Sequence, residues 1–189
     1  MTPRPTVVPD VAQVVALFQQ DLRHTDPPPG DRVLRTLLEL HRNNLDQWRC
    51  EDTTRGEGAS DAVVASAKRA IDAHNATRHR LVEAIDAALA DALEQDPAAT
   101  PATESPAMVF DRLSVLTIRL HVTEARAERD GFADRLPLLR DQLVILQRAL
   151  EGLFDDLRGG RKRFLSYRSL KVYGAGPATG PSTGDTRPD

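Results

Sequence analysis

Apolar residues recur along this chain at steps of three and four, which is the spacing of one face of an α-helix. The pattern fills five segments, residues 10–22, 32–52, 60–95, 103–129 and 136–157. In the last segment leucines alternate at steps of four and three: Leu139, Leu143, Leu146, Leu150, Leu153 and Leu157. Such a seam is typical of helices packed nearly antiparallel. The pattern therefore predicts an all-α fold, a single antiparallel helical bundle of about five long helices.

Residues 103–129 are apolar on nearly every side, so we expect them to form the central helix of the core. Ser105 and Pro106 mark its start, because serine caps free backbone N–H groups and proline has no N–H to lose there. One polar row recurs every seven residues: Arg112, Arg119 and Arg126. A second row places acid, hydroxyl and imidazole side by side: Asp111, Ser114, Thr117, His121, Glu124 and Glu128. We expect the arginines to reach solvent and the second row to be the candidate for chemistry.

The two ends of the chain differ from the bundle domain, which we assign to residues 10–173. Residues 1–9 are rich in proline and are expected to be a flexible N-terminus. After the fifth helix, the run RKRFLSYRSLKVYG predicts a short basic C-terminal helix. Residues 174–189 have little apolar content to bury and are expected to be a disordered tail.

Composition and charge narrow the classes of partner. A chain of 189 residues with 40% hydrophobic and 28% charged residues fits one globular domain. Its formal net charge of -3 gives no overall field that attracts nucleic acid, and no segment reaches the roughly 18 apolar residues of a membrane-spanning helix. Cys50 is the only cysteine, which fits a reducing compartment, and no signal peptide is evident. We therefore expect a cytoplasmic protein with no nucleic acid or membrane partner.

Polar residues also gather along one side of the second and third helices. The row on the second helix follows steps of three and four through His41, Asn44, Trp48, Glu51 and Arg55, with Asp52 next to Glu51. The row on the third helix, with Arg78 beside it, comprises Lys68, Asp72, Asn75, His79, Glu83 and Asp86. Such rows can be solvated faces that gain only about 0.2–0.5 kcal/mol for each i,i+4 pair. They can also be the walls of a polar interior.

Four motifs stand in order along the chain: HRNNLDQWRCEDTTR, IDAHNATRHRLVEAID, TESPAMVFDRLSVLTIRLH and YRSLKVYG. Together they resemble a bacterial all-helical family known as domain of unknown function 4254, over residues 33–174. The matching positions on the second helix are those of its row, and those on the third helix are Asp72, Asn75, Arg78, Glu83 and Asp86. The others are Glu104, Ser105, Pro106, Asp111, Arg112, Leu113, Ser114, His121, Tyr167, Arg168, Lys171 and Tyr173. The family usually has glycine where Ala107 stands and a Tyr-Asn-Asp-Pro-like turn where this chain reads Tyr-Gly-Ala. The resemblance implies the helical fold and an accessory role in surface-glycan or specialised-metabolite biosynthesis, and it implies no particular activity.

The first functional hypothesis is a site for a small anionic metabolite, such as a sugar phosphate or nucleotide sugar, where the polar rows meet in one interior cleft. Imidazole titrates near neutral pH and a carboxylate can tune it, so the predicted catalytic residues are His41, His121 and Asp111. The predicted ligand-binding residues are Asn44, Trp48, Glu51, Asp52, Arg55, Asp72, Asn75, Arg78, Glu104, Ser114, Tyr167, Arg168 and Lys171. Free N–H groups at residues 105–107 could add anion donors. No cofactor is expected, and magnesium with a phosphate is the one metal site that we entertain.

The alternative hypothesis is a non-catalytic interaction protein, in which buried polar rows fix the register of the helices. Its partner would be an unknown protein that docks on the basic C-terminal segment and tail, and a homodimer is a further option. The two hypotheses differ in shape, because a binding site needs a cleft and a register network needs none. Whether the protein is an enzyme stays open on the sequence alone.

Overall fold

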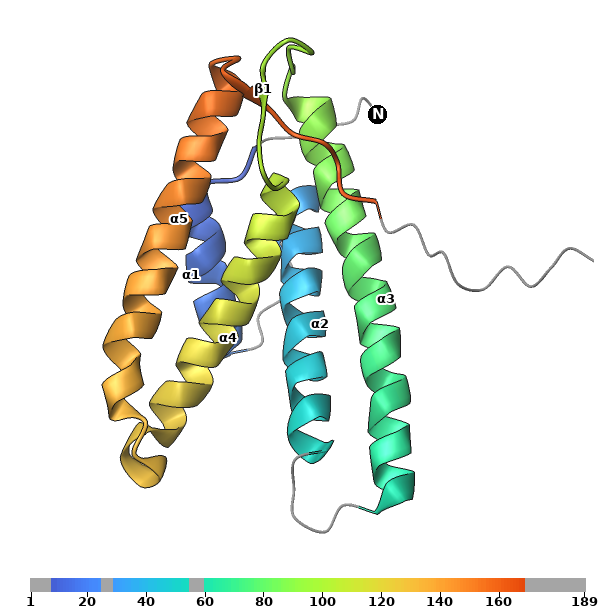
Figure 1. The fold of residues 1–189 in the computed structure, drawn as a ribbon, viewed down its shortest axis with the longest axis vertical. Coiled ribbons are helices and arrows are strands. Elements are labelled where there is room, and N and C mark those ends of the chain that lie inside the picture. The colour runs from blue at the N-terminus through green and yellow to red at the C-terminus, as the bar shows by residue number, and fades with distance from the viewer. Residues whose placement is uncertain (1–7, 25–28, 55–59, 169–189) are drawn as a thin grey trace, which may run out of the picture.

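The computed structural model describes residues 8–24, 29–54 and 60–168. Its long helices are α1 (Val11–Asp21), α2 (Arg32–Thr54), α3 (Asp61–Ala92), α4 (Pro106–Asp130) and α5 (Leu136–Arg158), with a short 3-10 helix, η1 (Ala133–Arg135), before α5. Figure 1 shows α2 and α3 as one antiparallel hairpin and α4 and α5 as a second, with α1 on the far side of α4. The all-α bundle that the sequence predicts is confirmed.

Local signals in the sequence set the ends of these helices. The Asp10 carboxylate accepts a hydrogen bond of 2.8 Å from the backbone N–H of Gln13 at the start of α1. Ser105 caps α4 in the same way through the N–H of Met108, at 3.4 Å. Gly131 ends α4 with a φ of 71°, a left-handed conformation that favours glycine because a Cβ would crowd the backbone.

The helix α4 is the centre of the bundle, as the apolar pattern predicts. It packs against all four of the other long helices, α1, α2, α3 and α5. None of those four, as described in the structure, contacts every other long helix. Phe110 of α4 is fully buried, with its ring 6.0 Å from that of Phe154 on α5. The outer face of α4 is not covered, however, because Arg112 and Arg119 remain exposed between α3 and α5.

The segment after α5 does not form the predicted basic helix over its described residues. Instead β2 (Lys162–Arg163) pairs in parallel with β1 (Thr100–Pro101), which lies in the connection between α3 and α4. Residues 164–168 follow without helical structure. The prediction of a short C-terminal helix is therefore wrong for residues 161–168, and residues 169–173 lie outside the part of the chain that the structure describes.

Tertiary hydrogen bonds explain this difference. The backbone N–H of Phe164 donates to Gln95 Oε1 at 2.6 Å, and that of Tyr167 donates to Asp86 Oδ2 at 2.9 Å. These N–H groups therefore bond to α3 and its C-terminal connection instead of to a preceding turn of their own helix. Phe164 is also buried in the core, so the segment gains more from packing along the end of the bundle than from local helix propensity.

Several sequence predictions fall on residues outside the described ranges. They are the flexible N-terminus over residues 1–7, the disordered tail over residues 174–189, and the ligand-binding roles of Arg55 and Lys171. Among the described helices, none combines the length and apolar character needed to cross a membrane.

Candidate functional site

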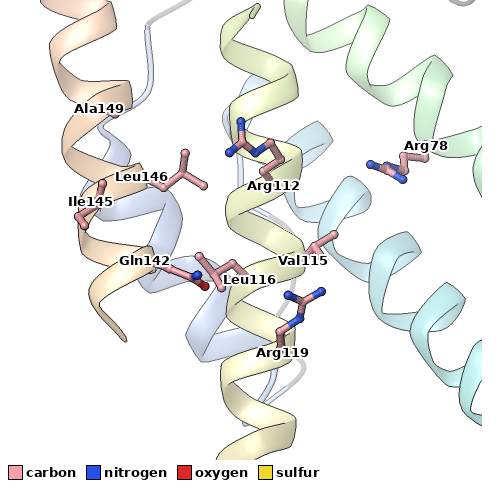
Figure 2. Close-up of a pocket in the computed structure, with 9 residues that line it drawn as sticks. All are labelled: Arg78, Arg112, Val115, Leu116, Arg119, Gln142, Ile145, Leu146 and Ala149. Carbon is pink, nitrogen blue, oxygen red and sulfur yellow. The ribbon is translucent and has the colours of Figure 1, made fainter. Parts of the chain in front are cut away.

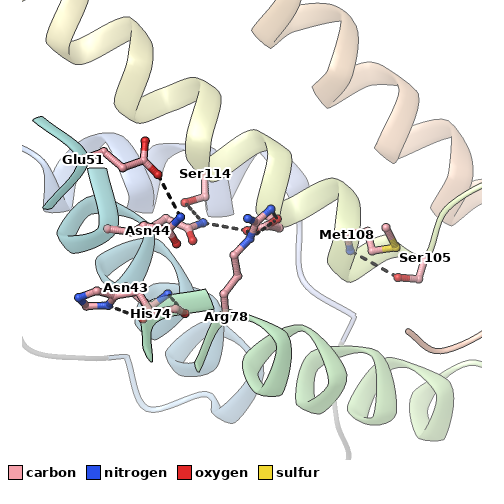
Figure 3. A network of polar contacts seen from close by, with 10 residues as sticks. Asn43, Asn44, Glu51, His74, Arg78, Ser105, Met108 and Ser114 are labelled. Atoms are coloured by element: carbon pink, nitrogen blue, oxygen red, sulfur yellow. Dashed lines mark hydrogen bonds and ion pairs between the residues drawn. The ribbon is translucent and has the colours of Figure 1, made fainter. Parts of the chain in front are cut away.

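A buried polar network joins α2, α3 and α4 around the carboxylate of Asp111, which is 5% exposed. Arg78 Nε lies 2.9 Å from each oxygen of this carboxylate, and Arg78 Nη2 also donates to Oδ2. Asn44 Nδ2 donates to Asp111 Oδ1 at 2.9 Å and to Ser114 Oγ at 3.1 Å. Figure 3 shows Asn44, Arg78 and Ser114 converging from their three helices. Four of the residues that the sequence selects are therefore brought together.

His41 continues this network towards α1 and away from solvent. Its ring is fully buried, lies 2.9 Å from Ser114 Oγ through Nδ1, and stacks on Phe18 with centroids 4.5 Å apart. Burial lowers the pKa of His41 from 6.5 to about 4, although the Asp21 carboxylate opposes this effect. The imidazole is therefore neutral at pH 7. His41 lines none of the cavities described below, so this geometry gives it no route to a ligand.

His121 lies on another side of α4. It lines a cavity of about 470 Å³ between α1, α4 and α5, together with Arg23 and Arg140. Ten residues separate His121 from Asp111, a rotation of roughly 80° around an α-helix. The three predicted catalytic residues therefore do not share one cleft, and their catalytic role stays a prediction.

The backbone N–H groups at the start of α4 are taken by the protein itself. Asp86 of α3 is fully buried, and its Oδ1 accepts from the N–H of Ala107 at 3.0 Å. The N–H of Met108 is bonded to its cap, Ser105. Burial raises the pKa of Asp86, against hydrogen bonds from Ser105, Tyr167 and Ala107 that lower it. The anion at this helix end is a carboxylate of the chain, so these two N–H groups are not available to a ligand.

The C-terminal half of α2 contributes residues that lie apart from the buried network. Asp52 forms an ion pair of 3.0 Å with Arg126 of α4, and Glu51 accepts a hydrogen bond of 3.2 Å from Gln47. Trp48 lines a cavity of about 520 Å³ between α4 and α5. Its indole Nε1 is buried and has no hydrogen-bond partner among the residues that the structure describes.

The remaining predicted ligand-binding residues are dispersed. Glu104 forms an ion pair of 2.6 Å with Arg112, and the ring of Tyr167 lies 5.7 Å from that of His79. Asp72 and Arg168 are exposed, and Asn75 is half-buried. Within the described ranges, no group of three histidine, cysteine or acidic residues is placed to hold a metal ion. Magnesium bound with a phosphate stays a prediction.

A site of which the sequence predicts only Arg78 lies on the outer face of α4. This cavity of about 550 Å³, which we call the arginine cavity, is lined by Arg78, Arg112, Val115, Leu116, Arg119, Gln142, Ile145, Leu146 and Ala149. Figure 2 shows α4 as its floor, α5 along one side and Arg78 reaching in from α3. The signal in the sequence is the seven-residue spacing of arginines with apolar residues between them, a pattern that also predicts a row directed to solvent.

The three guanidinium groups of the arginine cavity differ in their partners. Arg78 is bound to Asp111 and Arg112 to Glu104. Arg119 is exposed and makes no hydrogen bond or ion pair with any described residue. The cavity therefore carries one more positive charge than its acidic partners offset.

Comparison with known proteins gives one match. A family model described as Protein of unknown function (DUF4254) matches residues 34–165. No curated protein and no solved structure matches the chain. The matched range contains the arginine cavity and the buried network, but neither α1 nor Tyr167.

Proposed function

Because the chain belongs to the family described as Protein of unknown function (DUF4254), and that description names no reaction, we propose a function from the geometry. The protein binds a small anionic metabolite, such as a sugar phosphate or nucleotide sugar, in the arginine cavity. The observation that carries this proposal is Arg119, a guanidinium in a cavity without an acidic partner among the described residues. Guanidinium groups present paired N–H donors that match phosphate oxygens.

Charge and size both favour such a ligand. Three guanidinium groups line the cavity while two carboxylates, those of Asp111 and Glu104, pair with them. A bound anion would offset the remaining charge of Arg119. The volume of about 550 Å³ also falls within the roughly 300–1,000 Å³ that is typical of small-molecule sites.

In this proposal the buried network positions the binding site. Asp111 holds Arg78 through two nitrogens, Asn44 donates to that carboxylate, and Ser114 accepts from the same Asn44 amide. Arg78 is 33% exposed, so its guanidinium is anchored on one side and open to the cavity on the other. Asp111 and His41 would then act through Arg78, and chemical transformation of the ligand stays a prediction.

The test is thermal unfolding of the purified protein against sugar phosphates, nucleotide sugars and nucleotides, with and without magnesium. A ligand at 100 times its Kd stabilises the folded state by about 2.7 kcal/mol, which raises the Tm of a chain of this size by roughly 5–11 °C. Arg119→Gln should abolish the shift. The matched control is Arg148→Gln, which removes an exposed arginine of α5 that lines none of the cavities above. A shift that survives in Arg119→Gln would refute the proposed site.

A non-catalytic interaction protein is the second candidate, and the exposed face of α5 favours it. Leu138 is 61% exposed and Ile145 is 67% exposed, and their seven-residue spacing places them on one face of α5. A contiguous exposed apolar patch is typical of an interaction surface. The partner would be an unknown protein or a second copy of this chain. Light scattering on the protein and on Ile145→Ser tests whether a second copy binds there.

The bacterial origin and cytoplasmic location also stay proposals, supported by the resemblance and by the free Cys50.

A further inference from the structure

The arginine cavity continues at both ends along α4. A cavity of about 290 Å³ on the side of Val109 shares Arg112, Leu146 and Ala149 with it. The cavity of about 520 Å³ beside Trp48 shares Arg119 and Gln142. The three cavities therefore adjoin one another along α4, and we call them together the α4 trough. From Val109 to Arg126 it follows roughly 25 Å of helix at 1.5 Å per residue.

Two guanidinium groups of the trough have no acidic partner among the described residues: Arg119 near its middle, and Arg135, which lies over the ring of Phe132. Apolar side chains dominate the walls. At the two ends the arginines of α4 already have acidic partners, since Arg112 pairs with Glu104 and Arg126 with Asp52. Arg119 lies between them without such a partner in the described ranges. The apolar lining beyond the arginine cavity comprises Val109, Leu150 and Leu153 at one end and Val122, Phe132, Leu138 and Leu139 at the other.

We propose that the α4 trough binds an anionic amphiphile, with one phosphate group at Arg119 and an aliphatic chain laid along α4. This inference rests on the proposed function, because both place the anion at Arg119. The inference adds an aliphatic chain to the ligand, since a compact sugar phosphate would leave the exposed walls at Leu138 and Ile145 uncovered. An acidic helix of a partner protein would need unpaired cations repeated along the trough, whereas Arg112 and Arg126 already have acidic partners and Arg135 lies against the ring of Phe132.

The aliphatic chain of the proposed ligand leads to a quantitative prediction of affinity. A fully buried methylene group raises affinity about fourfold, and one that is half covered in an open trough raises it about twofold. Across butyl, hexyl, octyl and decyl phosphate the protein should therefore bind about 60-fold more tightly from the first to the last. Isothermal titration calorimetry on the full chain measures this series, with every phosphate kept below the concentration at which it forms micelles.

Two classes of variant separate the head group from the chain. Arg119→Gln should weaken all four alkyl phosphates by a similar factor of about ten or more, because each loses a charged hydrogen-bond donor. Ile145→Ser and Leu138→Ser should reduce the gain with chain length and spare butyl phosphate. Val144→Ser is the matched control, since Val144 is the neighbour of Ile145, is 45% exposed, and lines the His121 cavity instead.

The outcomes distinguish this inference from the function on which it rests. Equal binding of butyl and decyl phosphate would overturn the amphiphile and leave the anion site in place. Failure of every alkyl phosphate and sugar phosphate to bind would overturn both. A gain with chain length that persists in Ile145→Ser and Leu138→Ser would place the chain elsewhere. A stable dimer that Ile145→Ser dissociates would show that a second copy covers the trough, which would also overturn the inference.

Discussion

Replacing Asp111 by asparagine tests whether the buried network holds the bundle together. The Asp111 carboxylate accepts from Arg78 Nε, Arg78 Nη2 and Asn44 Nδ2. An asparagine amide keeps one oxygen and adds an NH₂ group, which would face donors where the carboxylate presents acceptors. The substitution also leaves the Arg78 guanidinium without its counter-charge. Asp111→Asn should therefore destabilise the folded state.

The expected magnitude follows from the burial of the pair. Breaking a buried ion pair costs about 3–5 kcal/mol, because one charge remains without compensation. The side chain of Asp111 is 7% exposed but that of Arg78 is 33% exposed, so water can solvate part of the guanidinium. We discount the cost for this solvation to about 2–3 kcal/mol, which lowers the Tm by roughly 4–12 °C.

Thermal and urea unfolding at pH 7 measure this cost, and the chain provides a matched control. Asp46 pairs with Arg49 at 3.1 Å, but the two side chains are 53% and 68% exposed. Asp46→Asn makes the same chemical change in solvent and should alter stability by no more than about 0.5 kcal/mol. Equal effects of the two substitutions would refute the structural role of Asp111.

Three further predictions concern His41, Gly131 and Arg119. The pKa of His41 falls from 6.5 to about 4 on folding, so between these pH values the unfolded state binds a proton that the folded state does not. The free energy of unfolding should therefore decrease by about 3 kcal/mol as the pH falls from 6.5 to 4. Denaturant unfolding from pH 7 to pH 4 should show this loss in the parent protein and a flatter profile in His41→Leu. Gly131→Ala should cost about 1 kcal/mol by thermal unfolding, since φ is 71° there, while no atom beyond the adjacent residues lies within 4 Å of the added Cβ. Arg119→Gln should leave the Tm of the ligand-free protein nearly unchanged, because no described residue pairs with Arg119; a large loss would indicate a structural role instead.

Much of the fold follows from sequence alone, because local rules agree with the tertiary arrangement. Capping by Asp10 and Ser105 and the stop at Gly131 place the helix ends within a few residues. The convergence of Asn44, Arg78 and Asp111 also follows, since antiparallel helices bring polar rows from separate segments face to face. A segment with one apolar seam and one capping residue has few alternative structures, so its sequence is enough to predict the helix.

The sequence predictions fail where the outcome depends on distant segments. The C-terminal helix is lost because Asp86 and Gln95 accept the hydrogen bonds of the backbone N–H groups of Tyr167 and Phe164. His121 shares a polar row with Asp111, but the row winds around α4 and reaches another cavity. In the sequence, Arg119 resembles any arginine that points to solvent. It lines a cavity only because α3 and α5 flank this face of α4.

The hydrogen bonds of Asp86 have a consequence for the order in which the chain folds. This carboxylate joins the start of α4 to a segment 81 residues further along than Asp86 itself. Closing so long a loop costs conformational entropy before any contact rewards it, whereas the α2–α3 and α4–α5 hairpins form from near neighbours. We therefore expect the hairpins to pair first and the segment around Tyr167 to dock last, which completes the desolvation of Asp86 at the end of folding.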